Sequence, residues 1–226
     1  MNALILLALA VAPGLAICIL IYVKDKYNRE PRLLLILSFI LGMIAIIPAY
    51  FIEQTGAIFV LEGTSTEMTL VFAFIVVGAT EEGCKFFMLR VYSYRKRDFD
   101  EPFDGIMYSV MIAMGFATLE NIMYVSQFGI GNAFLRMFTA VPAHAVCGII
   151  MGYYAGLAKF NLNAKPLLFR GWFYAMLLHG AYDFSLMDKN IPLIIFGAVL
   201  SLYLGVRFSL KAIRLHQEGS PFRNRI

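Results

Sequence analysis

Apolar runs of roughly bilayer length recur along the whole chain and constrain its fold more than any other feature. About 20 residues at ~1.5 Å each span the ~30 Å hydrocarbon core of a membrane. The chain is 60% hydrophobic and 15% charged, more apolar than a typical soluble domain. We therefore predict an all-α, polytopic membrane bundle of about seven transmembrane helices, at residues 3–23, 33–52, 68–92, 105–125, 135–158, 171–187 and 191–212.

Lysine and arginine alternate between the connections of these helices. Residues 24–32 carry four of them, and residues 93–104 and 159–170 carry three each. Residues 53–67 and 126–134 are predicted loops without any, and the predicted turn 188–190 has only Lys189. Because basic loops remain in the cytoplasm, the N-terminus is expected outside and the C-terminus inside. The spread of these charges over short loops favours contact with anionic lipid and argues against nucleic-acid binding.

The sequence indicates one transmembrane domain over residues 1–212 and a basic cytoplasmic tail over 213–226. No basic residue precedes the first apolar run, so we do not expect a cleaved signal peptide. The cysteines Cys18, Cys84 and Cys147 all lie in apolar runs and are expected to be free, buried thiols. His216 falls in the predicted tail and is expected to have no special role.

Ionisable residues inside the predicted spans are the main functional signal, because each is costly in lipid and needs a partner or a function. Depths along the predicted helices place all of them between the midplane and the outer half of the membrane. His179 and Asp183 are four residues apart and can touch on one helix face. His144 shares its face with three glycines, which favours close packing with another helix. The set is Glu81, Glu82, Glu120, His144, His179 and Asp183.

Lys85 lies four residues after Glu81 and three after Glu82, so one glutamate is expected to form an ion pair and the other to act as a base. Carboxylates and imidazoles activate water either directly or through a bound metal ion. Rival interpretations are a proton- or ion-coupled transporter, which also places Glu and His at mid-membrane, and a non-catalytic sensor whose buried charges join helices.

Five motifs resemble the PrsW family of bacterial membrane proteases, relatives of the CAAX prenyl endopeptidases. They are EEGCK at 81–85, FDGIMY at 103–108, GFATLEN at 115–121, HAVCGIIMGYYAG at 144–156 and HGAYDF at 179–184, and the opening segment 12–31 is also similar. The resemblance implies an intramembrane endopeptidase that makes the site-1 cut in a single-span anti-sigma factor. That cut would activate an envelope-stress sigma factor, and the protein would lie in the bacterial cell membrane.

The resemblance also implies roles for particular residues. Glu81 is favoured as the base by analogy with the first glutamate of the relatives' motif, and Glu82 is expected to be essential. Where the CAAX relatives have His in the second motif this chain has Glu120, and where they have Asn in the last motif it has Asp183. The added carboxylates favour a divalent metal, such as zinc, held by Glu120, His144 and His179. A metal-free glutamate mechanism and a CAAX-type processing peptidase with another substrate both stay open.

Overall fold

The computed structural model describes residues 3–59, 65–187 and 191–225, and these ranges contain helices and no strands. The helices, in chain order, are α1 (Ala3–Lys24), α2 (Arg32–Phe59), α3 (Thr66–Val71), the π-helix η1 (Phe72–Gly78), α4 (Ala79–Val91), the short η2 (Ser93–Arg95), α5 (Pro102–Phe138), α6 (Ala140–Lys159), α7 (Ala164–Met187), α8 (Ile191–Glu218) and the short η3 (Arg223–Arg225). The prediction of an all-α membrane bundle is confirmed.

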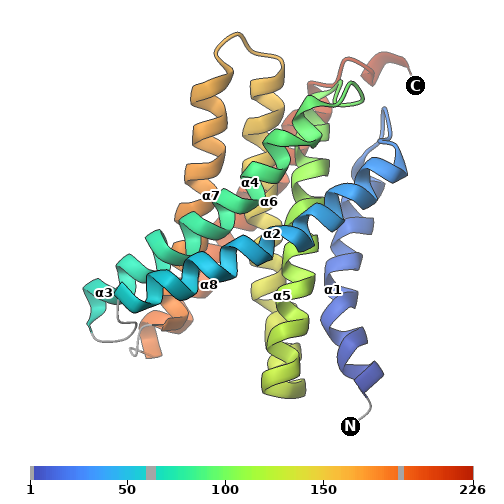
Figure 1. The fold of residues 1–226 in the computed structure, drawn as a ribbon. Coiled ribbons are helices and arrows are strands. Elements are labelled where there is room, and N and C mark those ends of the chain that lie inside the picture. The colour runs from blue at the N-terminus through green and yellow to red at the C-terminus, as the bar shows by residue number, and fades with distance from the viewer. Residues whose placement is uncertain (1–2, 60–64, 188–190, 226) are drawn as a thin grey trace.

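Helix α5 forms the centre of the bundle, with α1, α2 and α6 packed along it (Figure 1). Its residues from Phe103 to Thr118 are all buried, so this part of the helix is enclosed on every side rather than along one stripe. Helix α2 and the continuous helical run from α3 to α4 lie obliquely across the more upright helices. The upright helices are thus crossed on one face by α2 and the α3–α4 run, and α8 passes obliquely behind them (Figure 1).

Small residues determine where the helices cross. A side chain at Gly152 of α6 would overlap the Gly105 carbonyl of α5, and one at Gly115 of α5 would overlap the Phe39 carbonyl of α2. Backbones therefore touch directly at these crossings, as small residues allow in membrane bundles. Gly148 and Gly152 follow His144 on one face of α6, and that face packs against α5. This packing turns His144 towards the interior, as the sequence predicts.

Four stretches of the described chain are long and apolar enough to cross a membrane: Leu4–Lys24, Arg32–Phe59, Pro102–Lys159 and Phe196–Glu218. The basic loops and the C-terminal segment lie together at one end of the bundle, and the N-terminus lies at the other end (Figure 1). This grouping agrees with the charge alternation. The number of helices that cross the membrane and the side that faces the cytoplasm stay predictions.

Two of the predicted loops are wrong. Helix α2 continues to Phe59, so the first part of the predicted loop 53–67 is helical. Glu53 therefore lies on a helix. Helix α5 continues through the predicted loop 126–134 to Phe138 and is interrupted only at Gly129, which has φ 73°. Glycine tolerates this positive φ because it lacks a Cβ, and the changed backbone angle redirects the chain without a loop. The predicted turn 188–190 lies outside the described residues.

The first part of the polar C-terminal stretch is helical. Helix α8 runs to Glu218, past the predicted tail boundary at residue 213. His216 is 2% exposed and stacks on Tyr153, with 4.5 Å between ring centroids. This turn of α8 therefore packs against α6, and the expected absence of a special role for His216 stays a prediction.

Candidate functional site

The π-helix η1 places the two adjacent glutamates. It ends at Gly78, whose missing side chain lets the backbone of α7 approach: a Cβ there would lie 3.1 Å from the Met176 carbonyl oxygen. Glu81 and Glu82 follow in the first turn of α4. The wider π turn changes the register of the helix, a distortion common at functional sites. The close contact with α7 brings Glu82 beside His179.

Lys85 joins three groups of the site. Its Nζ lies 3.0 Å from Glu81 Oε2, 2.8 Å from Glu82 Oε1 and 3.0 Å from His144 Nδ1. All four residues are buried. An ammonium group has three donors and no acceptor, so the three contacts use all its protons. Nδ1 of His144 must therefore accept, and its Nε2 carries the ring proton. The predicted ion pair of Lys85 is present, and it includes both glutamates.

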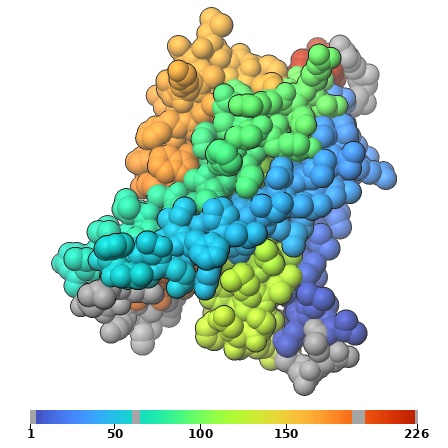
Figure 2. All heavy atoms as spheres, viewed as in Figure 1, coloured from blue at the N-terminus to red at the C-terminus, as the bar shows by residue number. Residues whose placement is uncertain are grey.

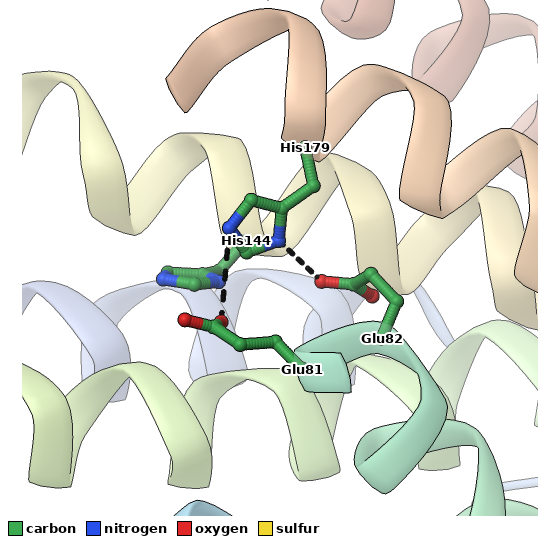
Figure 3. A group of neighbouring side chains, drawn as sticks. All are labelled: Glu81, Glu82, His144 and His179. Atoms are coloured by element: carbon green, nitrogen blue, oxygen red, sulfur yellow. Dashed lines mark hydrogen bonds and ion pairs between the residues drawn. The ribbon is translucent and has the colours of Figure 1, made fainter. Parts of the chain in front are cut away.

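His179 lies between carboxylates, which it meets through both ring nitrogens. Nδ1 is 2.7 Å from Glu82 Oε1, and Nε2 is 3.1 Å from Asp183 Oδ2 and 3.7 Å from Glu81 Oε2. Figure 3 shows His179 of α7 directed towards the two glutamates of α4, with His144 of α6 beside them. The predicted contact between His179 and Asp183 on one helix face is present. These carboxylates fix the orientation of the imidazole.

Glu120 and His144 form the other side of the site. His144 Nε2 donates to Glu120 Oε2 at 2.8 Å, and Arg136 Nη2 donates to the same oxygen at 2.7 Å. Arg136 also donates to Asn121 at 2.6 Å, and its guanidinium lies 4.1 Å from the centroid of the Tyr124 ring. All six residues of the predicted site thus belong to one network, which is contributed by α4, α5, α6 and α7.

A cavity of about 770 Å³ opens beside this network, in the half of the bundle away from the basic loops. Glu81, Glu120, His144, His179 and Asp183 line it, whereas Glu82 lies behind them with 0% exposure. The C-terminal half of α2 forms one wall and the C-terminal half of α5 another, and these two segments lie next to each other in Figure 2. A substrate in this cavity would meet Glu81 before Glu82.

The donors suit a divalent metal ion. Glu81, Glu82, His144 and His179 are buried and offer ligand atoms that all lie within 4.8 Å of one another. Two carboxylates and two imidazoles are ligand types that zinc accepts. This set differs from the predicted ligands Glu120, His144 and His179, because the Glu120 carboxylate is engaged by Arg136. The Lys85 ammonium already contacts three of the four donors, so it supplies positive charge at the same place.

A helical membrane bundle that holds carboxylates and imidazoles beside an internal cavity has the groups that a membrane-embedded hydrolase needs to activate water. Residues 30–209 match the family model described as "PrsW family intramembrane metalloprotease". The chain belongs to the PrsW family. It is accordingly a membrane-embedded peptidase and a multi-pass protein of the bacterial cell membrane, so the transporter and sensor interpretations are not supported.

Curated relatives agree over most of their length. "Protease PrsW" of Bacillus subtilis (strain 168) is 38% identical over 184 residues, which is 80% of this chain and 82% of the relative. "Protease PrsW" of Oceanobacillus iheyensis is 36% identical over 208 residues, covering 91% of this chain and 94% of the relative. That of Clostridioides difficile is 38% identical over 194 residues, or 80% and 79%. No solved structure gives a significant match.

Arg136, Asn121 and Glu53 are further neighbours of the site that the sequence pattern does not predict. Arg136 carried a usable signal, since an arginine within an apolar stretch requires an acidic partner. Glu53 was missed because it was assigned to a loop. On α2 it shares one helix face with five other residues that line the cavity: Ile46, Ala49, Tyr50, Gln54 and Ala57.

Proposed function

We propose that this peptidase makes the site-1 cut in a single-span anti-sigma factor, on its extracytoplasmic side, and so starts the release of an envelope-stress sigma factor. The position of the cavity carries this proposal. It lies in the half of the bundle away from the basic loops, which the positive-inside rule assigns to the outer leaflet. A substrate helix that enters there presents its outer end to Glu81.

In the proposed reaction, Glu81 is the general base. Its carboxylate takes a proton from a water molecule, and the water oxygen bonds to the carbonyl carbon of the scissile peptide. His179 Nε2 lies 3.1 Å from Asp183 Oδ2 and 3.7 Å from Glu81 Oε2, and its proton turns from Asp183 towards the oxyanion as the oxyanion forms. Glu81 then passes the proton to the amide nitrogen as the carbon–nitrogen bond breaks. The products are a carboxylate and an amine, and Glu81 returns to its ionised form.

The remaining residues hold this pair in place. Glu82 and Asp183 each hydrogen-bond a nitrogen of His179, and Lys85 joins Glu81 to Glu82 and His144. Glu120 fixes the tautomer of His144. A divalent metal, when bound by Glu81, Glu82, His144 and His179, would supply Lewis-acid polarisation of the water or the carbonyl. The metal content of the purified protein tests this ligand assignment. It is compared with that of His144→Ala, which removes one of the four ligands, and with that of Glu120→Ala, which removes none of them.

The substrate assignment is tested in the host cell. An anti-sigma factor with an extracytoplasmic tag should be shortened when stress is applied, and it should stay intact in a strain that lacks this chain. Wild-type protein should restore the cut, and Glu81→Gln, expressed at the same level, should not. Normal shortening of the anti-sigma factor in the deletion strain would exclude this substrate, although the peptidase activity itself would stand.

A further inference from the structure

Four carboxylates of described residues line the cavity, and three of them have a basic side chain beside them. Glu81 contacts Lys85, Glu120 contacts Arg136, and Asp183 contacts His179. Glu53 is the fourth, and it forms no ion pair with any residue that the structure describes. Its Oε1 atom is buried and has no hydrogen-bond partner. A carboxylate left without a partner in low-dielectric surroundings is costly, so its place in the cavity wall calls for an explanation.

Helical periodicity directs Glu53 into the cavity. Tyr50, Glu53, Gln54 and Ala57 repeat at three- and four-residue intervals on α2, and all of them line it. On the α5 wall, Asn132 offers an Oδ1 atom that is likewise buried without a partner. Both of these open groups are acceptors when Glu53 is ionised. Among the described residues that line the cavity, these two buried oxygen atoms therefore have no hydrogen-bond donor, and Glu53 has no ion-pair partner.

We propose that Glu53 is a specificity-determining residue that binds a basic side chain of the substrate, a lysine or arginine close to the scissile bond. This inference rests on the proposed peptidase reaction in the same cavity. Glu53 does not belong to the group of residues whose atoms could share a metal ion. The ammonium or guanidinium group of the substrate supplies the missing cation, and the ion pair sets which peptide bond lies over Glu81.

A panel of single-span peptides in proteoliposomes tests the proposal. Each peptide carries Lys, Gln or Glu at one position of the outer juxtamembrane segment, and cleavage is followed by mass spectrometry. Wild-type protein should cut the Lys peptide about tenfold faster than the Glu peptide at one or two positions. In Glu53→Gln this ratio should fall to near 1, and in Glu53→Lys it should invert. Glu67→Gln, which removes an exposed carboxylate of α3, should keep the wild-type ratio.

The outcomes separate this inference from the reaction it rests on. Cleavage without any charge preference, or a preference that Glu53→Gln retains, overturns the role of Glu53 and leaves the peptidase intact. If Glu53→Lys does not fold, the ratio in Glu53→Gln decides alone, and thermal unfolding of that variant shows that it is folded. If wild-type protein cuts none of the peptides, the proposed reaction fails and the role of Glu53 falls with it.

Discussion

His179 Nδ1 lies 2.7 Å from a carboxylate oxygen of Glu82, while Nε2 of the same ring lies 3.1 Å from Asp183. The imidazole is thus held from both sides. Removal of one of these partners typically costs 10- to 100-fold in activity. We expect Asp183→Asn to lower kcat by about that factor, measured on a single-span peptide in proteoliposomes. Asp98→Asn, in an exposed loop, should leave kcat unchanged. Equal rates for both variants would contradict the positioning role of Asp183.

Lys85 neutralises two buried carboxylates at once. Its loss in Lys85→Met leaves Glu81 and Glu82 without their shared cation, and breaking a buried pair of this kind costs about 3–5 kcal/mol. We expect the free energy of unfolding, measured with denaturant in detergent, to fall by about that amount. Lys165→Met, at an exposed position of α7, should change it by less than about 0.5 kcal/mol. Comparable stability of the two variants would show that Lys85 is not needed for charge balance.

The Glu120–Arg136 pair joins the beginning of α6 to α5 through His144. Arg136→Gln leaves the Glu120 carboxylate without its guanidinium partner, so we expect a clear loss of stability. The double variant Glu120→Gln with Arg136→Gln removes both charges and keeps an acceptor for His144. Its melting temperature should lie above that of Arg136→Gln alone. If the two losses simply add, Arg136 does not act through Glu120.

Two glycines should respond to alanine in opposite directions. At Gly152 the added Cβ would overlap the Gly105 carbonyl, and overpacking of this kind costs about 1–3 kcal/mol. At Gly131 nothing lies within 4 Å of the added Cβ, so the higher helix propensity of alanine should stabilise α5 by up to about 1 kcal/mol. The melting temperature should therefore fall in Gly152→Ala and rise in Gly131→Ala. A gain of stability in Gly152→Ala would contradict the close backbone contact between α5 and α6.

Two buried carboxyls near the basic loops predict a pH dependence of stability. Burial raises the pKa of Glu30, which bonds Tyr108, and of Glu101, which bonds Ser220, to about 7 each. In the unfolded chain these groups titrate near pH 4.3. Between these values the folded state holds protons that the unfolded state has lost, so stability falls as pH rises from about 4.5 to 7.

The Glu30→Gln, Glu101→Gln double variant should reduce that pH dependence, because its amides do not titrate. Melting temperatures at pH 5 and pH 7.5 give the comparison, with wild-type protein showing the larger drop. An equal drop in both proteins would assign the effect to other groups.

Much of this architecture follows from local pattern. Apolar runs predict the helices, and the spacing of His179 and Asp183 predicts their contact. The glycine ladder after His144 predicts the packing of α6. The extension of α2 past Glu53 could not be predicted in this way, because cavity-lining polar residues interrupt the apolar run that marks a span. The pairing of Glu120 with Arg136 could not be predicted either. It depends on the backbone turn at Gly129, which lets α5 continue to Arg136.

The central claim is that Glu81 and Glu82 make water attack a peptide bond inside the bundle. The most direct test is cleavage of a single-span peptide by purified protein in proteoliposomes, with Glu81→Gln, Glu82→Gln and His179→Ala measured beside wild type. We predict that wild-type protein releases two fragments and that the variants lose about 10²- to 10⁴-fold in rate while remaining folded. Wild-type rates in all three folded variants would contradict the account.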